Sequence, residues 1–551
     1  MATVRELHSS DAVTRIIPPV LALLLAACSG VIGDAGAVEP VRPMDHFPTA
    51  DECEAVDPYL ALPMRRMDRD EYAAVYSALV GRDVSAELRG PDQLGTSGGM
   101  LRNDAAAGVT TAAVEAMLDD ADVIAAALLS ADVAPRFDVC VADDASRACA
   151  ERFVIALAQR AFRRPIGTGE LAALMSTYER ELAAGSGEEL LSTVRRVLLA
   201  PETFYRPELG DGAGELRRLT AHELASRLSF TLTGEPPSDA LIAAATEGAL
   251  DDAASRRTWA ERLLFDGDRP TEVARAHLGR LFFDWLELGE LQSIELEGDS
   301  DLAERWRDET MAFVEEVVFT RRGGTEMLLD GGFAMLDETL ASTYGEPAVA
   351  GDTLRPVESD VRRGLLQQGS FLGATWAEER TAIHRGAYLV RRFFCSEFGP
   401  IPAAANDFVA RETGSERERL AETDTNPSCA SCHGTINPLG FAFGELGREG
   451  ELRELDLFGE PILTAGEARW LGPVEGAQDV SARMAESEEV QACVSQWLFT
   501  FASGRRLERS EPADACQLRA LTEQPSTLGQ LLDYVGSDAF THNRILAGET
   551  E

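Results

Sequence analysis

The chain has 551 residues, 45% hydrophobic and 26% charged, a globular composition long enough for several domains. Its 51 basic and 93 acidic residues give a net charge of −42 at pH 7. A field of this sign repels phosphate backbones, so we expect no nucleic-acid partner.

The N-terminal segment predicts export. An apolar run over residues 16–27 follows Arg5 and Arg15, and it has the length of a signal-peptide core rather than of a membrane-spanning helix. The run ends in Leu25-Ala26-Ala27-Cys28, which resembles the bacterial lipobox, in which the cysteine is lipidated and becomes the first residue. The alternative is an ordinary cleaved signal with an incidental cysteine. We expect residues 29–60 to form a tether between this N-terminal segment and the first helical domain.

The middle of the chain predicts a series of amphipathic helices. Apolar residues between 153 and 162 follow a 3.6-residue period, and Thr220 with Glu223 has the spacing of a capping box before 224–232. Strand patterns are scarce, so the expected fold is mainly α, with several helical domains in series and a small cytochrome c-like segment. Further helices are expected over 255–265, 272–288, 302–321, 383–394, 479–503 and 527–535, and long loops near 86–100, 346–358, 400–428 and 440–475.

The strongest chemical signal is Cys429-Ala430-Ser431-Cys432-His433, the spacing of a c-type haem site. Two thiols three positions apart can form thioethers with the two haem vinyl groups, and the adjacent imidazole can bind the iron. We expect a backbone carbonyl near Pro438 to accept the other ring N–H of His433.

Two other interpretations of the same spacing compete with covalent haem. A redox disulfide between Cys429 and Cys432 would be expected beside a βαβ pattern, which the sequence lacks. A structural zinc ion would need a second pair of Cys or His ligands at zinc-finger spacing, which is also missing. The sequence therefore favours haem c.

The sixth iron ligand is left open by the sequence. Met484 lies 51 residues after His433 (484 − 433), a separation familiar from small c-type cytochromes, but a methionine in an amphipathic helix is more often a core residue. His384 and His542 are weaker candidates, because histidines of exported proteins usually have structural or surface roles.

The remaining cysteines predict disulfides. Removing Cys28 as the anchor and two haem-linked cysteines from nine leaves six, an even number, as expected outside the cytoplasm. Close spacing favours pairing Cys140 with Cys149 and Cys493 with Cys516. Elimination then pairs Cys53 with Cys395.

Short motifs also occur in a fixed order along the chain, at 64–72, 160–165, 200–206, 227–230, 283–286, 307–310, 340–345, 363–366, 384–386, 437–441, 504–506 and 537–540. Together with the haem motif they resemble a large secreted family of planctomycete and myxobacterial proteins, which string domains of unknown function around a cytochrome c-like segment. Asn437 departs from the family pattern, where an acidic residue is usual, and the usual polyproline stretch is reduced to 399–402.

These observations suggest seven segments: 1–28 as a lipoprotein signal peptide, 29–60 as the tether, 61–135 and 136–210 as helical domains, 211–350 as a long helical domain, 355–470 as the cytochrome c-like haem-binding domain and 475–545 as a C-terminal helical domain.

Three classes of function stay open. The favoured one is an exported, lipid-anchored electron-transfer or redox subunit, because a single haem motif occurs without a phosphate loop, nucleophile elbow or HExxH motif. The others are a haem enzyme with an open sixth position and a cell-surface scaffold linked to polysaccharide processing. Expected partners are other exported redox or surface proteins, with membrane contact through the anchor alone. Glu309, Asp337 and Glu338 are candidate catalytic carboxylates, but the favoured interpretation is that they are helix-surface charges.

The lipobox generates a direct prediction. Wild-type protein should partition into detergent and membranes of the cell envelope, with the outer membrane favoured because Ser29 is not an inner-membrane retention residue by the enteric rule. Cys28→Ala should remove the acyl chains and with them the partitioning, because each buried CH₂ contributes about 0.8 kcal/mol to membrane affinity. Equal membrane association of Cys28→Ala would refute lipidation at Cys28.

Overall fold

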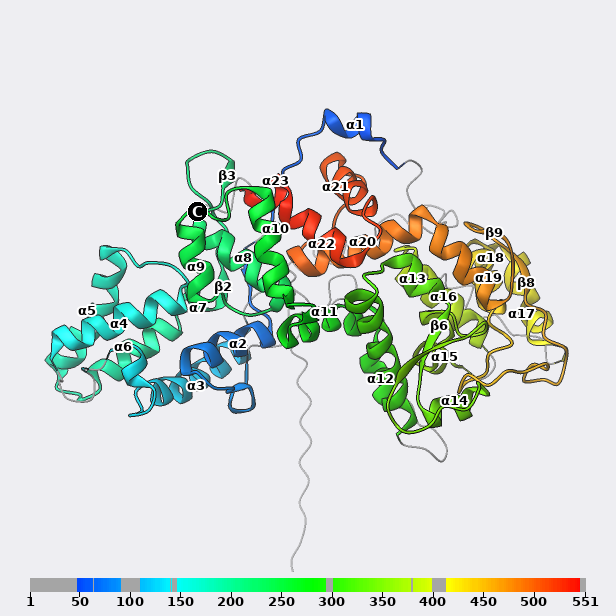
Figure 1. Cartoon of the computed structure of the whole chain (residues 1–551), viewed down its shortest axis with the longest axis horizontal. Helices are drawn as coiled ribbons and strands as arrows, with labels where there is room; N and C mark the ends of the chain where they lie inside the picture. The colour runs from blue at the N-terminus through cyan, green and yellow to red at the C-terminus, as the bar shows by residue number, and fades with distance from the viewer. Residues whose placement is uncertain are drawn as a thin grey trace, which may run out of the picture.

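The computed structural model of the chain describes residues 47–62, 64–90, 110–138, 140, 146–293, 301–377, 380–398 and 413–545 (Figure 1). Cys28 and the signal segment lie outside these residues. The described part is mainly α-helical, as predicted, with five two-stranded antiparallel sheets. In the described ranges, no helix is long and apolar enough to cross a membrane.

The predicted helices are confirmed, with two refinements. Thr220 caps α8 through the expected capping box with Glu223. The run 479–503 is divided in two, because Ser487 ends α19 and caps α20. The expected loop 400–428 contains a helix, α17, which opens with a capping box between Ser415 and Glu418.

The bounds are α8 (Ala221–Thr233), α9 (Asp239–Thr246), α10 (Ala253–Leu264), α11 (Glu272–Trp285), α12 (Leu302–Glu315), α13 (Thr325–Asp330), α14 (Glu338–Tyr344), α15 (Gly369–Ala374), α16 (Thr381–Phe393), α17 (Glu416–Thr425), α18 (Pro427–Phe441), α19 (Gly476–Glu486), α20 (Glu488–Ser503), α21 (Pro512–Thr522), α22 (Thr527–Gly536) and α23 (Asp538–Thr541).

Two large hydrophobic cores, and a small cluster of Ala382, Leu420 and Phe441, organise the helices of the described residues. The smaller of the two cores lies in the lobe at the left of Figure 1, where helices from the first two hundred residues pack together. The larger core extends from Leu60 to Phe540 and draws on helices from α8 onwards. The helices of the first lobe are α2 (Arg69–Val80), α3 (Thr111–Leu128), α4 (Arg147–Ala161), α5 (Thr168–Ala184), α6 (Glu189–Leu198) and α7 (Pro201–Phe204); α1 (Ala50–Glu54) lies beside α21.

Short strand pairs join distant parts of the chain. Strand β1 (Arg65–Arg66) pairs with β2 (Tyr205–Arg206), and β3 (Leu216–Arg218) pairs with β10 (His542–Arg544) near the end of the described chain. The other pairs are β4 (Phe265–Asp266) with β5 (Arg269–Pro270), β6 (Phe333–Leu336) with β7 (Arg355–Glu358) and β8 (Ala465–Ala468) with β9 (Gly472–Glu475).

A network of buried ion pairs joins the lobe that contains the smaller core to the helices that form the larger core. Arg206 contacts Glu71 at 3.2 Å and Glu208 at 3.4 Å, and Arg227 forms a second ion pair with Glu208. Arg227 also donates to the carbonyl of Phe540 at 2.8 Å. Because unpaired buried charges are costly, each member keeps the others in place. The network therefore fixes α2, β2, α8 and α23 relative to one another.

The six paired cysteines form three disulfides, but only one predicted pairing is correct. Cys140 is bonded to Cys149, as expected. The pairs 493–516 and 53–395 are wrong, because the bonds are Cys53–Cys516 and Cys395–Cys493, with Cα–Cα distances of 5.5 and 5.4 Å.

The orientation of two neighbouring helices explains the exchange of partners. Cys493 is fully buried in α20 and faces the end of α16, whereas Cys516 on α21 faces α1. The two cysteines therefore point towards different elements despite their short separation in sequence. The number of cysteines predicted how many disulfides form, whereas the packing of the helices decides which cysteines are bonded to each other.

The expectation of surface charges at Glu309 and Asp337 is also wrong. Asp337 is buried, caps α14 and pairs with Arg305 at 2.8 Å, while Glu338 is exposed as expected. Glu309 is 0% exposed, and its carboxyl accepts a 2.5 Å hydrogen bond from the Tyr344 hydroxyl.

The contacts of Tyr344 extend this buried cluster into the following segment. Its hydroxyl oxygen accepts a 2.9 Å bond from the backbone N–H of Gly369, and Arg362 stacks on its ring at 3.8 Å. The cluster thus ties α12 and α14 to α15. Burial raises the pKa of Glu309 to about 7, although the Tyr344 hydrogen bond and Arg362 act in the opposite direction.

The raised pKa predicts a pH-dependent stability. Glu309 takes up a proton more readily in the folded state than in the unfolded state, where its pKa is 4.5. The free energy of unfolding should therefore fall as pH rises from about 4.5 to above 7, by up to about 3 kcal/mol from this group. Glu309→Gln should lose that part of the dependence in denaturant titrations at a series of pH values.

The exposed Glu338→Gln is the matched control, and it should keep the wild-type dependence. Identical pH profiles for wild type and Glu309→Gln would show that Glu309 does not titrate in this range.

Candidate functional site

The Cys-x-x-Cys-His motif, residues 429–433, lies in the first half of α18. Asn426 caps this helix and Pro427 occupies its first position. Cys429 is buried and Cys432 half-buried, and both are free thiols. Since three residues correspond to about one helical turn, the two thiols lie on one side of the helix. His433 follows them directly and is also half-buried.

A close backbone contact places α18 on α16. A Cβ atom on Gly386 would lie 2.0 Å from the carbonyl oxygen of Ile436, and one on Gly440 would lie 1.8 Å from that of Ala382. Real Cβ atoms do not approach so closely, so only glycine fits at either position. The antiparallel register of these contacts places the motif alongside the second half of α16.

Arg385, next to Gly386, secures the other end of α18. Its fully buried guanidinium donates to the carbonyls of Phe443, Leu446 and Gly447 at 2.6, 2.8 and 3.2 Å. These carbonyls follow the helix, where backbone acceptors lack helical donors. Burial lowers the pKa of Arg385 to about 9. One arginine thus satisfies three acceptors and fixes where the chain leaves α18.

The orientation of His433 is set by Asn437, one turn further along α18. Nδ1 of His433 lies 3.1 Å from Oδ1 of Asn437. The amide nitrogen of Asn437 donates to Thr423 at 2.9 Å and to the carboxylate of Asp424 at 2.8 Å, both on α17. Because a carboxylate only accepts, the Asn437 oxygen must face His433, and Nδ1 of His433 carries the proton. The Nε2 atom of His433 then keeps its lone pair.

This finding corrects the expectation of a backbone carbonyl near Pro438. The acceptor is the Asn437 side chain, four residues after His433 on the same helix. Burial raises the pKa of Asp424, and the hydrogen bond from Asn437 together with the nearby His433 opposes that shift. This role of Asn437 was not predicted from the sequence, because the motif was not assigned to a helix, in which residues four apart, such as His433 and Asn437, lie on the same face.

The structure places the candidate sixth ligands in separate surroundings. Met484 is fully buried in the larger core, on α19, which packs on α13, α20 and β9. His384 lines a polar cavity of about 240 Å³ with Tyr388 and Arg391, and burial lowers its pKa. His542 contacts the ring of Tyr59, with ring centroids 4.8 Å apart and ring planes inclined by 54°. The sixth ligand therefore stays a prediction.

The donor set of α18 fits a covalently bound haem. It offers two free thiols one turn apart and an imidazole whose Nε2 is available to a metal, the groups that thioether formation and iron binding require. Cys429 and Cys432 are separate thiols, unlike the other six described cysteines. In the described ranges, no group of three or more His, Cys, Asp or Glu side chains is arranged to hold a metal ion.

Comparison with known proteins finds two family models that match parts of the chain, both described as proteins of unknown function. A model named PSD4, described as a protein of unknown function (DUF1592), matches residues 219–345. A model named PSCyt3, also described as a protein of unknown function (DUF1588), matches residues 362–456, which contain α16, α18 and the motif. No curated protein and no solved structure matches. The chain therefore carries, in series, two segments similar to domains whose function is undefined.

The contact between His433 and Asn437 predicts the tautomer of the free protein. When the imidazole is neutral, ¹⁵N NMR of the haem-free protein should show His433 protonated at Nδ1 and unprotonated at Nε2. Asn437→Leu should shift the tautomer ratio about fivefold towards the Nε2–H form, since a neutral hydrogen bond contributes about 1 kcal/mol.

His542 provides an internal control, because its Nδ1 contacts Thr541 and the Asp538 carbonyl instead and should not respond to Asn437→Leu. A His433 tautomer ratio unchanged by the substitution would contradict the role given to Asn437.

Proposed function

We propose that this chain is an exported, lipid-anchored c-type haem protein that serves as an electron-transfer or redox subunit. The observation that carries the proposal is the arrangement on α18, where two free thiols and an oriented imidazole lie within five consecutive residues. The name of the PSCyt3 model, whose match includes the motif, agrees with a cytochrome-like role. Three disulfides agree with a compartment outside the cytoplasm.

Each residue of the site has a distinct role in this proposal. Cys429 and Cys432 would hold the haem through thioether bonds, and His433 would bind the iron through Nε2. Asn437 is a positioning residue, which keeps the proton of His433 on Nδ1 and the ring in one orientation. When bound, the haem supplies reversible one-electron chemistry.

Electron transfer is favoured over catalysis by what surrounds the other candidate groups. Glu309 and Asp337, the carboxylates considered for catalysis, are buried and engaged with Tyr344, Arg305 and the cap of α14. A net charge of −42 favours an exported partner with a basic surface, because opposite charges speed association.

Covalent haem can be tested directly. Protein produced in a host with c-type maturation should retain haem after denaturation, visible as a peroxidase stain in a denaturing gel. Cys429→Ser combined with Cys432→Ser should abolish the stain, because both thioether bonds are lost.

The matched control is Cys140→Ser with Cys149→Ser, which also removes two cysteines but leaves α18 intact and should keep the stain. Stain that persists without Cys429 and Cys432, or wild-type protein that never takes up haem, would overturn the proposed function.

A further inference from the structure

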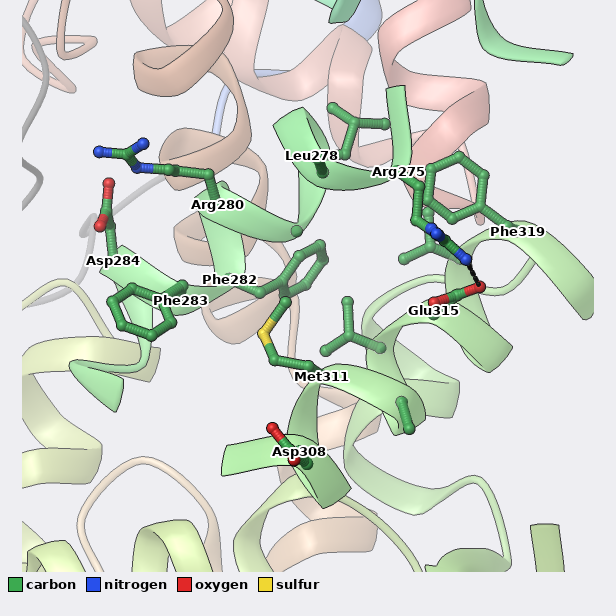
Figure 2. Close-up of a pocket in the computed structure, with 15 residues that line it drawn as sticks. Arg275, Leu278, Arg280, Phe282, Phe283, Asp284, Asp308, Met311, Glu315 and Phe319 are labelled. Atoms are coloured by element: carbon green, nitrogen blue, oxygen red, sulfur yellow. Dashed lines mark hydrogen bonds and ion pairs between the residues drawn. The ribbon is translucent and has the colours of Figure 1, made fainter. Parts of the chain in front are cut away.

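A cavity of about 720 Å³ opens between α11 and α12, away from the motif helix. Its floor is apolar, formed by buried side chains such as Leu278, Phe282 and Val318. Figure 2 shows Phe282 and Met311 extending into the space between the two helices. The volume falls within the range of about 300–1,000 Å³ typical of small-molecule sites, which are mostly apolar with few polar groups.

The charged groups of the cavity, its rim, lie at its two ends, where all except the buried Asp284 reach the surface. Arg275 pairs with Glu315 at 3.3 Å at one end, and Arg280, which pairs with Asp70, lies near Asp284 at the other (Figure 2). Asp308 adds a further carboxylate; it is 58% exposed and lies 3.7 Å from Arg307, which does not line the cavity. The lining thus contains three carboxylates, Asp284, Asp308 and Glu315, and two guanidinium groups, in a chain whose net charge is −42. An anionic ligand would be repelled here, whereas an uncharged apolar ligand would not.

The walls of the cavity contain two features that ordinary helix packing does not require. Gly279 lies in the interior of α11, where glycine costs about 1 kcal/mol relative to alanine. A Cβ atom there would come within 2.9 Å of the terminal methyl of Met311, so the missing side chain leaves room for Met311. The opposite wall continues from α12 into a π-helical turn, Glu316–Thr320, which contributes Val318 and Phe319. Such turns often occur at functional sites.

We propose that this cavity is a binding site for an uncharged, largely apolar small molecule. The apolar floor would bury its body, and the charged rim would exclude anions of the same shape. The proposal rests on α11, α12 and the π-helical turn that follows α12, and it does not depend on haem binding at α18.

Two fluorescent probes with the same ring skeleton test both parts of the proposal. N-phenyl-1-naphthylamine is uncharged, and 1-anilinonaphthalene-8-sulfonate carries one sulfonate. The neutral probe should bind the full-length protein saturably, with one molecule per chain. The sulfonate should bind at least about tenfold more weakly, because its charge meets the excess of rim carboxylates. Equal affinities, or binding without saturation, would overturn the proposal.

Variants assign the binding to this cavity. Ala312→Phe places a ring in the cavity from the half-buried wall of α12 and should weaken the neutral probe at least about tenfold. Gly279→Ala, a milder change, should push Met311 into the cavity and act in the same direction. Ala183→Leu, on an exposed face of α5, is the control and should bind like wild type. Circular dichroism melts check that each variant is folded, and unchanged affinity in folded Ala312→Phe would overturn the assignment.

The rim is tested separately by Asp308→Asn at an exposed position. This variant should strengthen binding of the sulfonate probe at least about twofold and leave the neutral probe unchanged. An unchanged sulfonate affinity would contradict the electrostatic role of the rim.

Competition then distinguishes two sources of an uncharged apolar ligand. Displacement of the neutral probe by a short-chain benzoquinone would indicate a ring-shaped ligand, and displacement by a monoacylglycerol would indicate a lipid acyl chain. Either result supports an uncharged apolar ligand, whereas failure of both competitors would count against the site.

Discussion

The placement of the motif depends on the backbone contact between α16 and α18. Gly386 and Gly440 allow carbonyl groups of the opposite helix to lie where a side chain would otherwise be. Any larger residue would push the helices apart, and α18 would lose its register with the body. Arg385 then fixes the exit of α18, and α17 folds back to orient Asn437. The site is therefore built on a rigid helix pair.

The motifs behind the sequence resemblance are explained mainly by structure. Arg206 and Arg227, from two of them, share the carboxylate of Glu208 at the junction of the lobes. Arg227 reaches the carbonyl of Phe540, and Arg65 reaches that of Ala502. These motifs describe how distant segments meet, so they predict membership of an architecture better than they predict chemistry. Chemical information is concentrated in the motif of α18.

Helix positions followed from periodicity, because burial of one face repeats every 3.6 residues whatever the partner is. Periodicity does not, however, indicate which other residue or helix a buried residue will contact. Cys493 and Cys516 are near neighbours in sequence, yet each is bonded to a distant cysteine. Glu309 has the sequence surroundings of a surface residue but is enclosed by Tyr344 and the segment around Gly369. The sequence was enough to predict the number of disulfides and the haem-type spacing of the motif. The burial of Glu309 and the pairing of the cysteines depend on how the helices pack.

The bond between Cys53 and Cys516 spans 463 residues and closes nearly the whole folded body into a covalent ring, with the other two disulfides inside it. Extracellular proteases cut exposed loops, and in an open chain one cut before α18 would separate the motif from the N-terminal end. In the ring, one cut opens the circle but releases nothing, because the C-terminal fragment is still bonded to Cys53. A nicked molecule would thus keep the segment that carries α18 attached to the part of the chain around Cys53 until a reductant breaks that bond.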